Sequence, residues 1–144
     1  MVIKDQNTKL EILVEEKTPV VVQGAGDFAL RTSLSVRDGT IKFGEFTAST
    51  RSWIEIGKFN EFLRQLESLE TARLGSAEIE SMSPGEFRIR FYMKDGKGGI
   101  AAEGEVGHHV VGSNRINKVF FDVVLDPSLL RNILVEFKSL PSVS

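Results

Sequence analysis

The sequence contains no cysteine, which excludes disulfide-stabilised scaffolds, thiolate metal sites and cysteine nucleophiles. Histidine is nearly absent too, since His108 and His109 are the only two, and zinc sites need three or four ligands. No apolar run approaches the roughly 20 residues of a membrane-spanning helix. The N-terminal residues also lack the apolar segment of a signal peptide. We therefore expect a cytoplasmic protein that has no membrane association and binds no metal or other cofactor.

Neither sign of charge dominates the chain. The 18 Lys and Arg residues against 20 Asp and Glu residues give a net charge of −2, which argues against a net-basic nucleic-acid-binding protein. The composition, 41% hydrophobic and 26% charged, is close to that of an average globular protein and excludes disordered and collagen-like architectures. A length of 144 residues favours a single domain over residues 1–144.

Alternating apolar and polar residues predict antiparallel strands in both halves of the chain. Residues 28–36 alternate most clearly, with Thr32 as the polar exception on the apolar face. The following Asp38-Gly39 pair predicts a two-residue hairpin turn that leads into a return strand with a bulge at Gly44. Further strands are expected at residues 10–14, 53–56, 78–82, 87–93, 100–106 and 119–125.

Two segments have the spacing of amphipathic helices. The apolar stripe of the first helix consists of Phe59, Phe62, Leu63, Leu66 and Leu69. An equivalent stripe, shifted by 71 positions, consists of Leu130, Ile133, Leu134, Phe137 and Leu140. Asp126 and Pro127 are typical of an N-cap and a first helical position. We expect Gly75 to end the first helix and Pro141 to end the second.

The order of predicted elements is similar in the two halves, about residues 10–74 and 75–140. This order predicts an α+β fold of two tandem β-β-β-α units, in which antiparallel sheets pack on the two amphipathic helices. Each unit alone has one apolar sheet face and one apolar helix stripe. Both units are therefore expected to close on one common core.

One face of the strand predicted at residues 87–93 carries a basic, aromatic-bearing stripe of Arg88, Arg90, Tyr92 and Lys94, and such stripes are also found in nucleic-acid-binding proteins. A hairpin that pairs this strand with residues 100–106 sets Arg90 opposite Glu103 and Arg88 opposite Glu105. We therefore interpret the arginines as members of cross-strand ion pairs. The same register sets small residues opposite large ones, Ala102 against Phe91 and Gly104 against Ile89.

The histidine pair is a candidate for metal binding or acid–base chemistry. Adjacent residues on a strand point to opposite faces, so His108 and His109 cannot chelate one ion from an extended backbone. We expect one histidine to be packed and the other exposed. The alternative is a small-ligand-binding or enzymatic domain that uses one of them.

Other residues are candidates for partner binding. Arg51 and Trp53 are of the types enriched at binding hot spots, although a lone tryptophan fits a core position equally well. The polar loop at residues 111–117 has no counterpart in the first half and is either a binding loop or a solvated connection. The candidate partner-binding residues are Arg51, Trp53, His108, His109, Asn114 and Arg115, and no residue is assigned a catalytic role.

Three segments together resemble the small bacterial WapI-like immunity protein family: residues 75–87 (GSAEIESMSPGEF), 104–110 (GEVGHHV) and 121–130 (FDVVLDPSLL). The resemblance extends over about residues 28–140. It implies a single-domain, non-catalytic binding protein that neutralises a partner toxin used in competition between cells. The alternatives are the histidine-based site and a homo-oligomer that uses a sheet edge as its interface.

Overall fold

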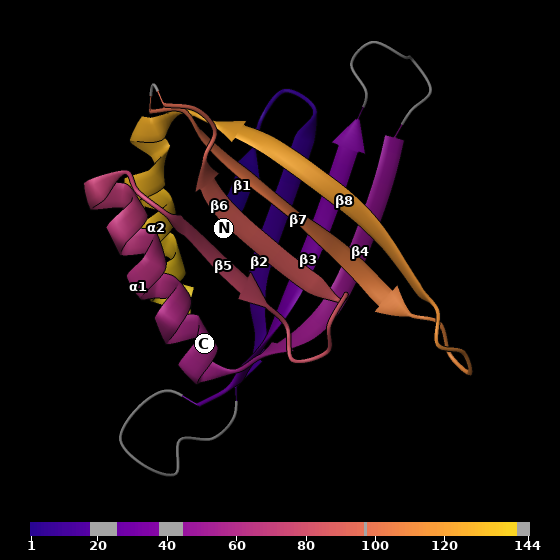
Figure 1. The fold of residues 1–144 in the computed structure, drawn as a ribbon. Helices are drawn as coiled ribbons and strands as arrows, with labels where there is room; N and C mark the ends of the chain where they lie inside the picture. Colours follow the sequence, from indigo (N-terminus) through magenta and orange to yellow (C-terminus); the bar gives the residue numbers. More distant parts are fainter. Residues whose placement is uncertain (18–25, 38–44, 97, 141–144) are drawn as a thin grey trace.

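The computed structural model of the chain describes residues 1–17, 26–37, 45–96 and 98–140. It contains two four-stranded antiparallel sheets, one in front of the other, with two helices along one side (Figure 1). The first sheet and its helix comprise β1 (Val2–Lys4), β2 (Thr8–Lys17), β3 (Phe28–Arg37), β4 (Glu45–Ile54) and α1 (Ile56–Ala72). The second comprise β5 (Ser76–Glu80), β6 (Phe87–Met93), β7 (Ile100–His109), β8 (Ile116–Leu125), the 3₁₀ turn η1 (Pro127–Leu129) and α2 (Leu130–Ser139).

The predicted α+β class is confirmed, and each helix follows its own antiparallel sheet along the chain. Each sheet has four strands, so each unit is β-β-β-β-α rather than the predicted β-β-β-α. No separate strand occupies residues 53–56, because β4 continues to Ile54 and Ile56 already begins α1. The Asp38-Gly39 turn, the Gly44 bulge and the Pro141 stop lie outside the described residues.

The first helix ends earlier than predicted. Arg73 adopts a left-handed conformation with φ of 56°, and its N–H donates to the Leu69 carbonyl oxygen at 3.1 Å. The prediction that Gly75 is the stop is therefore wrong, although Gly75 also has a positive φ, of 80°, where the chain turns into β5. An arginine takes the left-handed position that glycine usually fills.

The N-terminal hydrogen bonds of the two helices come from residues at different distances along the chain. Before α2, the Asp126 Oδ1 atom accepts a hydrogen bond from the Ser128 N–H at 2.9 Å, and Pro127 opens the 3₁₀ turn, which confirms the predicted start. Before α1, Glu55 makes no side-chain cap. The Ile56 N–H instead donates to the Asp27 Oδ1 atom at 2.9 Å, although Asp27 precedes β3 and lies 29 positions earlier in the chain.

A single apolar core joins the two units, because its buried residues come from both sheets and both helices. Phe62 of α1 lies at the junction: its ring centroid is 5.0 Å from that of Phe137 in α2 and 6.2 Å from that of Phe91 in β6. The Phe62–Phe137 pair is edge-to-face, and such pairs contribute about 0.5–1.5 kcal/mol beyond the area that they bury. The first helix thus stabilises the second unit as well as its own.

The register between β6 and β7 agrees with the prediction. Phe91 lies opposite Ala102, Ile89 opposite Gly104, and the Lys94 N–H donates to the Gly99 carbonyl oxygen at 2.8 Å. A Cβ atom on Gly104 would lie 1.9 Å from the Arg88 carbonyl oxygen and 2.8 Å from Phe121 Cζ. Glycine at this position therefore allows the two strands and the Phe121 ring to approach closely.

The apolar face of the first sheet carries buried hydroxyl groups. Thr32, the polar exception seen in the sequence, is fully buried on β3, and Ser52 is buried on β4. Neither hydroxyl has a hydrogen-bond partner within the part of the chain that the structure describes. Burial removes the hydrogen bonds of a hydroxyl group to water, and without a partner in the protein no hydrogen bond replaces them, so the burial is destabilising.

Candidate functional site

The face of the second sheet that points away from the first sheet is called here the outer face of the second sheet. In Figure 1 this face is toward the viewer, and neither helix crosses in front of β6, β7 and β8. Two cross-strand rows on it carry most of its charge. One row consists of Glu78, Arg90, Glu103 and Asp122, and the other of Glu80, Arg88, Glu105 and Phe120.

Ion pairs neutralise only part of this charge. Arg90 NH1 lies 3.0 Å from Glu103 Oε1, as the register predicted. The predicted pair between Arg88 and Glu105 is wrong, because Lys118 Nζ holds the Glu105 carboxylate at 3.4 Å from the neighbouring strand. Within residues 1–17, 26–37, 45–96 and 98–140, neither Arg88 nor Asp122 forms an ion pair.

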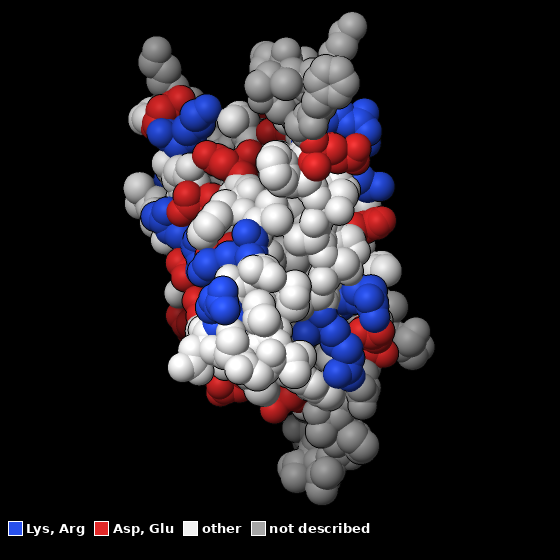
Figure 2. Space-filling view, turned by 90° about the vertical axis from the view of Figure 1, so that its right-hand side faces the viewer, with Lys and Arg blue, Asp and Glu red and all other residues white. Residues whose placement is uncertain are grey.

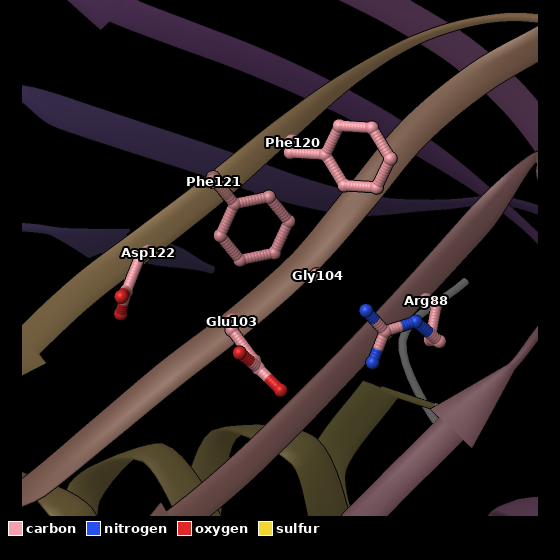
Figure 3. Close-up of a pocket in the computed structure, with 6 residues that line it drawn as sticks. All are labelled: Arg88, Glu103, Gly104, Phe120, Phe121 and Asp122. Atoms are coloured by element: carbon pink, nitrogen blue, oxygen red, sulfur yellow. The ribbon is translucent and has the colours of Figure 1, made fainter. Parts of the chain in front are cut away.

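A shallow pocket of about 320 Å³ opens where the two rows meet on β7 and β8. Figure 3 shows its lining residues, Arg88, Glu103, Gly104, Phe120, Phe121 and Asp122. Gly104 contributes no side chain, so the floor of the pocket is backbone with the buried Phe121 beside it. Phe120 is 62% exposed. The pocket therefore combines an exposed aromatic ring with carboxylates and one guanidinium group.

The Tyr92 hydroxyl group of β6 is affected by the charges on this face. Burial raises the pKa of this hydroxyl group, and the nearby Asp122 and Glu103 carboxylates raise that pKa further. The Arg90 guanidinium, 4.9 Å from the Tyr92 ring centroid, acts in the opposite direction. The two carboxylates therefore disfavour a negative charge on the Tyr92 hydroxyl group.

A second hollow of about 280 Å³ lies where edge strand β4 of the first sheet meets β7 and β8. Its lining residues are Thr47, Ala48, Ser49, Gly107, His108, Asn117, Lys118 and Val119. Figure 2 views the side on which the connection between β7 and β8 projects and shows a broad uncharged area with Lys and Arg in a few places.

The structure distributes the predicted site residues over three places. Arg51 and Trp53 lie together on β4, with the guanidinium carbon 5.3 Å from the ring centroid and Arg51 Nε 3.3 Å from Glu15 Oε2. His108 and His109 end β7, and Asn114 and Arg115 lie in the exposed connection to β8.

The structure also shows how deeply the two histidines and Trp53 are buried. Both histidines are exposed, so the prediction that one is packed is wrong: the end of β7 extends beyond the apolar core. Trp53 is half-buried rather than a core residue, and its carbonyl oxygen accepts a hydrogen bond from the Met82 N–H at 2.9 Å.

Phe120 and Asp122 did not emerge as candidates from the sequence. The signal was present, because in the alternation of residues 119–125 these two side chains fall on the face opposite Phe121 and Val123. The pocket itself was not predictable, since it is assembled from β6, β7 and β8.

The described residues contain no group of three or more His, Cys, Asp or Glu side chains arranged to hold a metal ion. Among the helices of the same ranges, none is both long and apolar enough to cross a bilayer.

The arrangement is that of an α+β protein with charged, uncovered sheet faces. Over residues 1–140 the chain matches the immunity protein WapI-like family, and it belongs to that family. None of the curated proteins matched this sequence.

Two solved structures are similar to this chain at low sequence identity. The crystal structure of WHY1 from Arabidopsis thaliana is 13% identical, with a TM-score of 0.47 over 98% of this chain and 87% of that one. The plant transcriptional regulator PBF-2 is 11% identical, with a TM-score of 0.45 over 98% of this chain and 79% of that one.

Proposed function

We propose that the protein is an immunity protein that binds a partner toxin and blocks it by covering part of the toxin surface, without catalysing a reaction. The observation that carries this proposal is membership of the WapI-like immunity family over residues 1–140. The uncovered sheet faces support it, because a rigid sheet presents a preformed surface that loses little conformational freedom on binding.

The site based on the histidines has less support. His108 lines the hollow between the sheets, but none of the described residues lining that hollow is a carboxylate. A general acid–base site needs a second group that orients or complements the imidazole. His109, the next residue on β7, is not among those lining residues.

The test uses the candidate toxin domains encoded by the genes that neighbour the gene for this protein. Cells that express the toxin domain alone are expected to stop growing, and co-expression of the immunity protein is expected to restore growth. Size-exclusion chromatography of the purified mixture is expected to give one stoichiometric complex. Continued growth arrest in cells that contain the folded protein at equal or higher levels than the toxin would contradict the proposal.

A further inference from the structure

We propose that the outer face of the second sheet is the surface that docks the partner, and that a lysine or arginine side chain of the partner enters the pocket beside Asp122. This inference rests on the proposed function and specifies the surface that performs it. The occupant is a protein with a basic surface, because the charges of this face are complementary to it.

The first argument is exposure. Along β8, Phe120 is 62% exposed and Val124 is 51% exposed, while the alternating residues Phe121, Val123 and Leu125 are buried. No helix of the described ranges crosses in front of β8 on this face (Figure 1). Exposed aromatic groups surrounded by polar ones are typical of surfaces that bind another protein.

The second argument is the charge of the central row. Glu103 and Asp122 are direct partners in the register of β7 and β8, and like charges in this position destabilise a sheet. Arg90 neutralises Glu103, which leaves the exposed Asp122 as a carboxylate without an ion pair among the described residues. A cation bound beside Asp122 would remove this repulsion.

The third argument is the balance over the whole face. Its five carboxylates are Glu78, Glu80, Glu103, Glu105 and Asp122, and its four cationic groups are Arg88, Arg90, Lys118 and Lys94, which follows Tyr92 in the alternation. Five negative charges against four positive ones leave an excess of one negative charge. A basic partner surface would be attracted to this excess and oriented by it during encounter.

The fourth argument concerns the aromatic wall of the pocket. The Phe120 ring already attracts a cation, because Lys118 Nζ lies 5.4 Å from its centroid. A partner lysine or arginine in the pocket would therefore have a carboxylate on one side and an aromatic ring on another.

Arg88 is the one cationic group that lines the pocket. In the register it lies opposite Glu80, which has the opposite charge, and opposite Glu105, whose carboxylate is paired with Lys118. Asp122, in contrast, faces another carboxylate across the strands. The residue whose charge is poorly compensated is thus the aspartate, which favours a cationic occupant over an anionic one.

The experiment takes the toxin domain that the growth test identifies and measures its Kd by calorimetry for paired variants. Asp122→Lys is compared with Glu136→Lys on α2, which changes the net charge equally at another exposed site. Phe120→Ala is compared with Phe46→Ala, whose ring on β4 is 63% exposed. We expect Asp122→Lys to weaken binding about 100-fold and Phe120→Ala about 20-fold. Both controls should stay within about threefold of the unmodified protein.

Two further variants keep the test decisive. Asp122→Asn, which preserves the size of the side chain, is expected to weaken binding about tenfold even if the lysine variant folds poorly. Arg88→Gln is expected to leave the Kd unchanged or lower it, because it removes a cation from the pocket. Circular dichroism and melting temperatures establish that each variant is folded.

The outcomes separate the two proposals. If the unmodified protein neither protects cells nor binds the toxin, the proposed function is wrong. If it binds and Asp122→Lys is no weaker than Glu136→Lys, the function stands and the docking surface is wrong. Weakening by Arg88→Gln with strengthening by Asp122→Lys would indicate an acidic partner group instead. A dimer of the protein alone that Phe120→Ala dissociates would assign the face to a second copy, which also overturns the proposal.

Discussion

The two sheets have the same antiparallel strand order, but the charged side chains on their outer faces are paired to different extents. On the first sheet, Glu15 lies 2.8 Å from Arg31 and 3.3 Å from Arg51, and Lys9 lies 3.9 Å from Glu11, so the charges compensate one another. On the second sheet, Asp122 has no ion pair among the described residues and faces Glu103. The backbone scaffold is therefore compatible with either a neutralised face or a face that attracts a charged partner.

The inner faces differ as well. The first sheet buries the Thr32 and Ser52 hydroxyl groups, whereas the second sheet is apolar and closely packed around Gly104 and Ala102. The first sheet thus contains buried hydroxyl groups that have no hydrogen-bond partner among the described residues, whereas the second contains tight steric contacts. Substitutions at matched depth are expected to have opposite effects in the two units.

The largest effect is expected from Phe62→Ala, which tests whether the two units depend on each other. Phe62 belongs to the first unit, but its ring contacts Phe91 and Phe137 of the second. We expect a loss of about 3–5 kcal/mol in the free energy of unfolding, with one cooperative transition in urea. Two separate transitions in the variant or in the unmodified protein would show that the units unfold independently. Phe46→Ala is the exposed control.

A smaller loss is expected from Gly104→Ala, which tests the steric character of the second sheet. The added methyl group would meet backbone at the Arg88 carbonyl, which cannot move aside as a flexible side chain can. We expect a destabilisation of about 1–3 kcal/mol, measured by urea unfolding. Gly96→Ala is the control, because nothing lies within 4 Å of its added Cβ atom. Equal stabilities of the two variants would refute the close approach at Gly104.

An increase in stability is expected from Thr32→Val, which tests the buried hydroxyl groups of the first sheet. The substitution keeps the shape of the side chain and removes a buried hydroxyl without a partner in the described ranges. We expect a gain of about 1 kcal/mol in the free energy of unfolding. Thr47→Val on the exposed part of β4 should change stability by less than about 0.5 kcal/mol. A loss at Thr32 would indicate that its hydroxyl is hydrogen-bonded in solution.

The smallest effect is expected at the second helix start and depends on pH. Hydrogen bonds from the Ser128 N–H and hydroxyl group lower the pKa of Asp126 in the folded state. Its contribution to stability is therefore complete above the unfolded-state pKa and is lost as the pH falls through the lowered folded-state pKa. Asp126→Asn should lower the Tm at neutral pH, and this difference should disappear below that folded-state pKa. A difference in Tm that is independent of pH would contradict the linkage.

Much of the fold was predictable because its signals are local. Alternation within ten-residue windows predicted β3, β6 and most of β7 and β8, and helical spacing predicted α1 and α2. The β6–β7 register followed from one short turn. The number of strands was not predictable in the same way, because β4 contains polar residues on the face that the core partly covers.

The candidate site was predictable only as a set of residue types. Arg51 and Trp53 are indeed in contact, as neighbours on one strand face should be. Phe120 and Asp122 were overlooked, because their importance depends on Glu103 and Arg88, which other strands contribute. A sequence pattern reports the direction of a side chain relative to its own strand and not what lies across from it.

The caps of the two helices show this division most clearly. The amino-acid sequence by itself determined the start of α2, because Asp126 and Ser128 are two positions apart and their hydrogen bond forms within one turn. Only the tertiary structure decided the start of α1, where the first sheet brings Asp27 to Ile56 from 29 positions away. Short-range hydrogen bonds, alternation and helical spacing act within a few residues. The pocket on the outer face of the second sheet, like the Asp27 cap, exists only after strands distant in sequence have paired.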